Sequence, residues 1–384
     1  MVIHVSISPR LLQVRVLCSL CTTTTTTTTT MATFEKEKHV RYFVSNLRML
    51  PTPYTETETN RITLGFFCLA ALDLMGELET ALSEQDRLDW IEWIYAQQVL
   101  PTAEEPDLNK ARCGFRGSSF SGIPFDPNAT HTEHIPYDSA HIANTYTALI
   151  NLLLLGDDLS RVNREAIVES IRHLQQKDGS IIPAEGSLEK DARFLFCACA
   201  VSYMLNDWSG LDLDLSLQYA KRLQTYEGTF GQAPDNEAHG GSTFCGVGAL
   251  TLMGKQEEGI LRKEKMIRWC LNQQTTGFAG RPNKDADTCY CFWIGAALEM
   301  LGAFDMVNHS NCREFLLSCQ TKIGGFAKAP GNFPDVMHSY MGVAALSLMK
   351  EPGLGTIVAS INAPLTAMER LRNTRFHQQP TTSS

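Results

Sequence analysis

Reactive side chains gather in residues 281–293, which read Arg-Pro-Asn-Lys-Asp-Ala-Asp-Thr-Cys-Tyr-Cys-Phe-Trp. This short stretch holds cations, carboxylates, thiols and a phenol, and it runs directly into an apolar segment that ends at Leu301. An apolar helix does not need charged residues and a thiol at its entrance in order to fold. We therefore expect these side chains to meet a ligand.

Asp287 and Cys289 could form a metal site together with His338. Carboxylate, thiolate and imidazole are all ligands of zinc, and a set of three protein ligands leaves a fourth position for a substrate. The residue types leave other roles open. Asp287 could cap a helix, Cys289 could pack as a small apolar group, and His338 could be an ordinary polar lining residue.

A second set of side chains is rich in hydrogen-bond donors: His239, Arg281, Lys284 and Tyr290. In a chain with a formal net charge of −9, four donors near one pocket indicate an anion such as a phosphate or diphosphate. The alternative is a solvated loop whose cations pair with neighbouring aspartates. Beside an apolar cavity, the two sets would suit a ligand with a charged head and an apolar tail.

An internal repeat must position these residues. Apolar segments begin 48 residues apart, at Asp191, His239, Asp287 and Asp335. Looser copies begin at Arg61 and Asp138. An aromatic residue occupies the sixth position of each regular copy: Phe196, Phe244, Phe292 and Tyr340. A glutamine followed by glycine precedes each copy: Gln176, Gln224, Gln274 and Gln320.

The repeat predicts an all-α fold. Each unit pairs one amphipathic helix with one helix that is apolar all round, and such a unit must stack on its neighbours to bury its faces. We expect an α/α barrel of about six inner and six outer helices. The common register would place the first residues of all inner helices at one end, so that six side chains converge there: Arg193, His239, Asp287, Cys289, Tyr290 and His338.

Composition limits the remaining possibilities. The chain has 384 residues, 43% of them apolar, and its acidity argues against broad nucleic-acid binding. Twelve scattered cysteines suggest a reduced, cytoplasmic protein, and no apolar run reaches the length of a membrane span. We expect a disordered low-complexity leader at residues 1–30, with a signal or transit peptide as the alternative, the barrel at 31–365 and a polar tail at 366–384.

At these residues the chain resembles the β subunits of protein prenyltransferases, and within them those of protein geranylgeranyltransferase type I. The resemblance covers residues 35–349 and rests on the glutamine-glycine repeat and several motifs. These are Arg-Cys-Gly-Phe-Arg-Gly-Ser-Ser (112–119), Tyr-Asp-Ser-Ala-His-Ile-Ala (137–143), Gly-Asp-Asp-Leu-Ser-Arg-Val-Asn (156–163), His-Gly-Gly-Ser-Thr-Phe-Cys-Gly (239–246), Gly-Arg-Pro-Asn-Lys (280–284) and Asp-Thr-Cys-Tyr (287–290).

The resemblance implies a role for each residue set. The family's zinc ligands, one ion per β subunit, fall on Asp287, Cys289 and His338. Its diphosphate-binding residues fall on His239, Arg281, Lys284 and Tyr290. The implied partners are a helical-repeat α subunit, geranylgeranyl diphosphate and proteins that end in a Cys-aliphatic-aliphatic-X (CaaX) sequence, in which the cysteine thiol is the acceptor.

Two positions bear on which prenyl group is used. Farnesyltransferase carries a bulky tryptophan where Thr63 stands, so the smaller side chain should leave room for a fourth isoprene unit. Farnesyltransferase also binds magnesium with a carboxylate ten residues before its zinc histidine, where this chain has Lys328. A lysine can neutralise diphosphate directly, so magnesium should be dispensable. The expected lipid and peptide contacts are Thr63, Phe67, Arg193, Trp293 and Met337.

Alternatives to a type I enzyme are a type II enzyme acting on Rab proteins, a farnesyltransferase, a terpene cyclase on the same barrel, and a non-catalytic binding barrel. A cyclase would need paired aspartates facing the cavity. The nearest run, at Asp212 and Asp214, lacks them and reads better as a helix cap or surface segment.

Overall fold

The computed structural model describes residues 33–102, 107–122 and 137–378. Contacts divide the chain into residues 1–32 and a second unit, Thr33–Ser384. The expected leader, residues 1–30, lies outside the described residues. No helix in the described part of the chain combines the length and the apolar character needed to cross a membrane.

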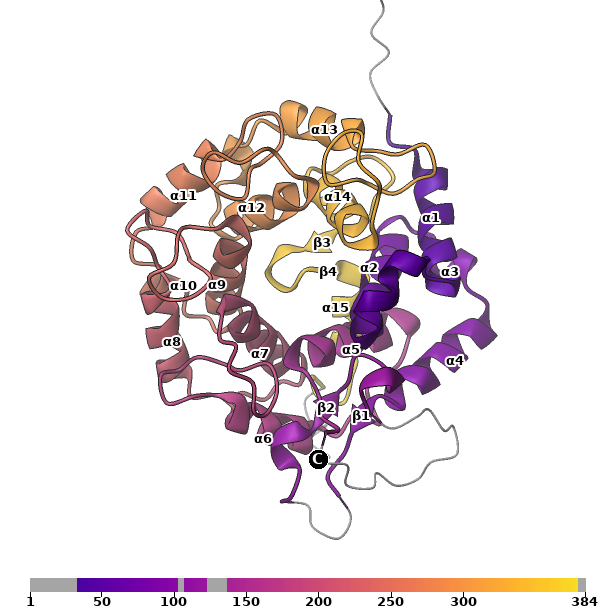
Figure 1. Ribbon diagram of the computed structural model, residues 1–384, viewed down its shortest axis with the longest axis vertical. Helices are drawn as coiled ribbons and strands as arrows, with labels where there is room; N and C mark the ends of the chain where they lie inside the picture. The colour runs from indigo at the N-terminus through magenta and orange to yellow at the C-terminus, as the bar shows by residue number, and fades with distance from the viewer. Residues whose placement is uncertain (1–32, 103–106, 123–136, 379–384) are drawn as a thin grey trace, which may run out of the picture. The chain divides into compact units, whose positions relative to one another are not determined.

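Six apolar helices form a closed inner ring in the second unit (Figure 1). Each contacts the next in chain order, and the last contacts the first. Their central residues are buried all round the helix, which is why these segments lie inside. The ring consists of α2 (Arg61–Leu74), α5 (Ile142–Leu155), α7 (Ala192–Met204), α9 (Gly240–Leu252), α12 (Thr288–Met300) and α14 (Val336–Leu348). The predicted all-α barrel is confirmed.

Six further helices surround this ring, and each buries at least one side chain on its inner side (Figure 1). They are α1 (Lys36–Arg48), α4 (Glu84–Tyr95), α6 (Arg164–Leu174), α8 (Leu213–Arg222), α11 (Lys263–Asn272) and α13 (His309–Ser318). The short elements are α3 (Leu78–Ala81), α10 (Gln256–Gly259) and five 3-10 turns, η1 (Thr52–Asn60), η2 (Lys110–Arg112), η3 (Ser119–Ser121), η4 (Phe304–Met306) and η5 (Ala359–Ile361). One small two-stranded ladder pairs β1 (Gln98–Val99) with β2 (Gly114–Phe115).

A belt of aromatic rings runs around the inside of the barrel, with one ring from each inner helix. Neighbouring centroids lie 5.1–6.0 Å apart along most of the belt, a spacing at which aromatic rings attract one another. Its members are Phe66, Tyr146, Phe196, Phe244, Phe292 and Tyr340. The four from the regular repeats were predicted, and Phe66 and Tyr146 come from the looser copies.

The residues that open the repeats are helix N-caps. Asp191, His239, Asp287 and Asp335 each accept a hydrogen bond from a backbone N–H in the first turn of their helix. The looser copy differs from the prediction, because α5 is capped by His141 and not by Asp138. Asp138 is buried before the helix and pairs with Arg116 at 2.8 Å.

Glutamine side chains join successive outer helices. In each case the amide donates to one backbone carbonyl and accepts from one backbone N–H at the entrance of the next outer helix. We call these contacts glutamine clasps. They are made by Gln98, Gln175, Gln224, Gln274 and Gln320. In the second of these, Gln175 makes the clasp, whereas the adjacent Gln176, which the sequence alignment of the repeats picked out, donates to the carbonyl of Leu174.

The Gln320 clasp closes the ring. Its amide nitrogen donates to the carbonyl of Thr33 at 3.0 Å, and its oxygen accepts from the N–H of Glu35 at 2.9 Å. His39 reinforces this junction, with Nε2 lying 3.0 Å from Gln320 Oε1 and Nδ1 accepting from the N–H of Gly325 at 3.0 Å. The start of the described chain is therefore tied to the last repeat.

The C-terminal segment differs from the expected polar tail at 366–384. A hairpin of β3 (Ile357–Val358) and β4 (Ala363–Pro364) enters the ring (Figure 1), and Tyr146 and Tyr340 donate to the carbonyls of Ile361 and Asn362. The helix α15 (Leu365–Arg372) follows and buries apolar side chains. Residues 366–378 thus belong to the folded unit because apolar residues as far as Phe376 pack into its core.

Candidate active site

Asp287, Cys289 and His338 meet where α12 and α14 begin. One ligand atom from each lies within 4.8 Å of the others. The 48-residue register explains this meeting, because it places the third position of one inner helix beside the fourth position of the next. Asp287 also caps α12 by accepting from the N–H of Cys289 at 2.9 Å. Capping and ligation are therefore compatible here, since the carboxylate has two oxygens.

Asp335 orients His338. Its carboxylate lies 2.6 Å from His338 Nδ1, while Nε2 points to Asp287 at 3.3 Å. Burial lowers the pKa of His338, but the two carboxylates outweigh burial and raise it to about 9. A carboxylate behind the second ring nitrogen is the usual support of a metal-binding histidine. Sequence reasoning identified Asp335 only as the start of a repeat.

The donor chemistry of this set fits a zinc ion. Asp287 and Cys289 are buried and His338 is nearly so, so that little of this set is exposed to solvent. Burial, and then the charge of Asp287, raise the pKa of the Cys289 thiol well above its usual value. This thiol therefore ionises only where a strong positive charge offsets that cost.

The predicted donor set is brought together in part. Tyr290 OH lies 2.9 Å from His239 Nε2. Burial, and then the charge of Arg281, lower the pKa of His239, which favours the neutral form of its ring. Arg281 pairs with Glu237, and Lys284 is exposed on the same loop. Lys328 Nζ lies 3.8 Å from Asp287 Oδ2, beside the metal-binding set.

A cavity of about 470 Å³ begins beside these donors and extends into the barrel. His239, Tyr290 and Arg193 stand at one end of it, and Arg193 pairs with Asp191. Aromatic belt residues and Trp293 form much of its wall. Its size and mostly apolar lining suit a single extended organic ligand.

Thr63 and Phe67 line this cavity as expected, whereas Met337 does not line it and packs against the core. The hydroxyl of Thr63 donates to Asn144 Oδ1 at 2.9 Å and lies 3.2 Å from Thr147 Oγ1. Several further lining residues were not predicted: Thr147, Gln232, Met341 and Asn362. The inward-facing helical period could have suggested Met341, but Asn362 comes from the hairpin and carries no such signal.

Asp212 and Asp214 do not face the cavity. Asp212 caps the outer helix α8 by accepting from the N–H groups of Asp214 and Leu215. The interpretation of this run as a helix cap is confirmed, and these residues supply no acid pair of the kind that a cyclase needs.

Comparison with known proteins agrees with this geometry. The model of the prenyltransferase alpha-alpha toroid domain matches residues 34–369. The chain belongs to this prenyltransferase family. Geranylgeranyl transferase type-1 subunit beta of Dictyostelium discoideum is 41% identical to it over 333 residues, which cover 85% of this chain and 94% of that protein. The corresponding subunit of Arabidopsis thaliana is 38% identical over 350 residues and covers 88% and 90%.

A solved structure shares the prenyltransferase fold. Geranylgeranyltransferase-I of Candida albicans complexed with GGPP aligns with a TM-score of 0.78 and 22% identity, over 90% of this chain and 100% of that chain. Such an identity bears on the fold alone. The Dictyostelium and Arabidopsis relatives are more similar in sequence, and both are type-1 β subunits. This chain is therefore similar to type-1 β subunits in particular, as its motifs indicated.

Proposed function

We propose that this chain is the catalytic β subunit of a zinc-dependent protein geranylgeranyltransferase of type I. It would transfer geranylgeranyl from geranylgeranyl diphosphate to the cysteine thiol of C-terminal CaaX sequences of small GTPases and similar proteins, preferably with Leu at X. One observation carries the proposal. An Asp-Cys-His donor set gathers at the start of α12, the inner helix whose Tyr290 and Trp293 line one apolar, aromatic cavity together with His239.

Asp287, Cys289 and His338 would hold the zinc ion. When bound, the ion supplies a positive charge that favours the thiolate form of an acceptor cysteine. Asp335 keeps Nε2 of His338 turned toward the other two ligands by holding Nδ1. The apolar tail of the lipid would lie along the aromatic wall of the cavity, away from water. The first carbon of the lipid, which bears the diphosphate, would then stay at the mouth of the cavity.

The donor set would stabilise the leaving group. As the sulfur–C1 bond forms, the C1–oxygen bond breaks and diphosphate departs with the electron pair. His239 and Tyr290 already share a hydrogen bond and can redirect their donors to this anion, and the exposed Lys328, beside Asp287, would add a cation. Arg281 could exchange Glu237 for the diphosphate, because exposed ion pairs are worth little. Donors aimed at developing charge lower the barrier.

The partner subunit and the cellular compartment belong to the same proposal. The relatives are named as subunits, which supports an α subunit as partner. We place the heterodimer in the cytoplasm, where free thiols persist.

Co-expression with a prenyltransferase α subunit tests the proposal. Transfer would be measured to peptides ending in Leu or Met, from geranylgeranyl or farnesyl diphosphate, with and without magnesium. We expect geranylgeranyl transfer to the Leu peptide without added magnesium. Preference for farnesyl, or a strict need for magnesium, would instead indicate a farnesyltransferase. A Rab protein, assayed as a further acceptor, would be the only substrate modified if the chain belonged to a type II enzyme.

A further inference from the structure

The start of each inner helix is tied to the repeat that follows it. The N–H groups of a first helical turn have no partner within their own helix, so a neighbouring segment must supply an acceptor. In five of the six inner helices of the described chain, that acceptor is a backbone carbonyl in the segment before the next inner helix. The donor and acceptor pairs, at 2.8–3.0 Å, are Ile62 with Gly117, Ile142 with Pro183, Ala192 with Gln232, Gly240 with Gly280, and Thr288 with Lys328. Such an acceptor remains whatever side chain the residue carries.

The last inner helix, α14, uses a side chain in place of this carbonyl. The N–H of Val336 donates to the phenolic oxygen of Tyr54 at 2.9 Å, although 282 residues separate the two in sequence. Tyr54 lies in η1, the segment before α2, so the acceptor comes from the same place in the ring as in the other repeats. Helix α14 also presents His338. The helix that carries this histidine therefore begins on a contact that a single substitution can remove.

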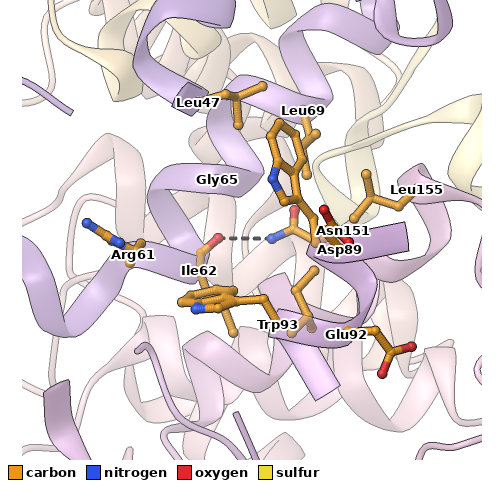
Figure 2. Close-up of a pocket in the computed structure, with 12 residues that line it drawn as sticks. Leu47, Arg61, Ile62, Gly65, Leu69, Asp89, Glu92, Trp93, Asn151 and Leu155 are labelled. Atoms are coloured by element: carbon orange, nitrogen blue, oxygen red, sulfur yellow. Dashed lines mark hydrogen bonds between the residues drawn. The ribbon is translucent and has the colours of Figure 1, made fainter. Parts of the chain in front are cut away.

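The segment that carries Tyr54 is itself firmly held. The N–H of Tyr54 donates to the carbonyl of Pro51 at 2.9 Å, and its carbonyl accepts from Thr57 Oγ1 at 2.8 Å. Helix α2 follows η1 directly, and the carbonyl of Ile62 in its first turn accepts from Asn151 Nδ2 at 2.9 Å (Figure 2). The Tyr54 hydroxyl is therefore presented to α14 from a support that is fixed on both sides.

The hydroxyl acts on the peptide unit that joins Asp335 to Val336. The carbonyl of this unit accepts from the N–H of Ser339 at 2.9 Å, and its N–H is the group that Tyr54 accepts. The side chain on the same unit, Asp335, accepts from the backbone N–H of His338 at 2.9 Å and lies 2.6 Å from its Nδ1. Rotation of this peptide unit would move the carboxylate that orients the imidazole.

We propose that Tyr54 is a positioning residue of the metal-binding set, taking Asp287, Cys289 and His338 as the zinc ligands of the proposed function. Its hydroxyl holds the first turn of α14, and through Asp335 it keeps Nε2 of His338 directed at the other two ligands. Such supporting contacts tune metal affinity without touching the ion. Because η1 continues into α2, which lines the central cavity, the same hydroxyl also fixes the metal-binding set relative to that cavity.

Tyr54→Phe tests this proposal, because it removes the oxygen and keeps the ring. Zinc affinity of the purified full chain would be measured by competition with a chelating dye. We expect the variant to bind zinc roughly tenfold more weakly, the lower end of the usual loss for an outer partner, since Tyr54 acts through Asp335. In the metal-free chain, the segment that begins at Val336 should exchange its amide hydrogens faster, as followed by mass spectrometry. Thr57→Val, which frees the Tyr54 carbonyl, should weaken zinc binding in the same direction and serves if Tyr54→Phe does not fold.

Tyr95→Phe is the matched control. It removes a tyrosine hydroxyl that donates to Asp157 at 2.6 Å on the outer helix α4, so it should lower stability in urea but leave zinc affinity unchanged. If Tyr54→Phe also lost stability alone and kept its zinc affinity, its role would be merely structural and the proposal would be overturned. Cys289→Ala gives the background. If the unsubstituted chain bound zinc no more tightly than Cys289→Ala, the metal site of the proposed function would fail, and the role of Tyr54 with it.

Discussion

Asp335 has two roles in the structure that its position in the sequence does not reveal. It caps α14 and holds Nδ1 of His338. Asp335→Asn keeps the cap, since asparagine caps helices as well as aspartate, but it removes the charge behind the imidazole. We expect zinc affinity to fall roughly 10–100-fold, the usual cost of losing an outer partner of a metal ligand. Competition with a chelating dye would measure it, with Asp212→Asn, a cap of the outer helix α8, as the matched control.

Lys328 should decide the magnesium requirement. Its side chain is 62% exposed and lies beside the metal-binding set. Lys328→Asp should lower the rate without magnesium roughly 10–100-fold, the loss of a charge-assisted hydrogen bond, and magnesium should restore much of it. Steady-state kinetics across a magnesium titration would show this. Lys322→Asp, on the exposed turn before it, should remain insensitive to magnesium.

Thr63 should set the length of the lipid. Thr63→Trp would fill part of the cavity that the threonine lines and shift preference from geranylgeranyl toward farnesyl diphosphate. Thr63→Val, which keeps the size but removes the hydroxyl bonded to Asn144, should keep the original preference. The ratio of kcat/KM for the two diphosphates is the measurement. If both variants keep the geranylgeranyl preference, Thr63 does not limit the pocket.

At the scale of elements, the junction between α1 and α13 should respond to pH. Burial lowers the pKa of His39 to about 4, from its usual 6.5. The unfolded chain therefore binds a proton near pH 6.5 that the folded chain refuses until about pH 4. Stability is complete above pH 6.5 and falls as the pH drops through this range, by roughly 3 kcal/mol. Protonation at Nδ1 would also oppose the N–H of Gly325.

Urea unfolding between pH 7.5 and 5 would measure this effect. His39→Gln should be less stable at pH 7.5 and show a flatter pH dependence than the unsubstituted chain. His173→Gln, on the exposed face of α6, should leave the dependence unchanged. If the free energy of unfolding of His39→Gln changed with pH as steeply as that of the unsubstituted chain, His39 would not have a lowered pKa in the folded state.

The sequence predicted most of the inner ring, because apolar segments with a fixed spacing can bury themselves in few ways. It also predicted the meeting of Asp287, Cys289 and His338, which follows from register. It could not distinguish Gln175 from Gln176, since which neighbour turns toward the next helix depends on backbone direction. The hairpin around Asn362 was missed because its contacts are tyrosine hydroxyls to backbone carbonyls, which leave no periodic pattern.

At the scale of the whole molecule, the barrel should not depend on its metal. The inner helices form a closed ring with a continuous core, and the metal-binding set lies at one end of it. Cys289→Ala should therefore lose zinc and transferase activity while circular dichroism and thermal unfolding remain close to those of the unsubstituted chain. Cys270→Ala, another buried cysteine on an outer helix, should keep both zinc and activity. Full activity without zinc in Cys289→Ala would remove the metal from the proposed function.

The clasp between Gln320 and the residues before α1 bears on how the chain is made. Glu35 emerges from the ribosome long before Gln320, its hydrogen-bond partner, which lies 285 residues further along the chain. Domains usually fold from the N-terminus as they emerge, but this edge of α1 finds its partner only when the last repeat arrives. Nascent chains that stall before residue 320 should thus leave the start of α1 without its partner and recruit chaperones. The ring can therefore close only after nearly the whole barrel has been synthesised.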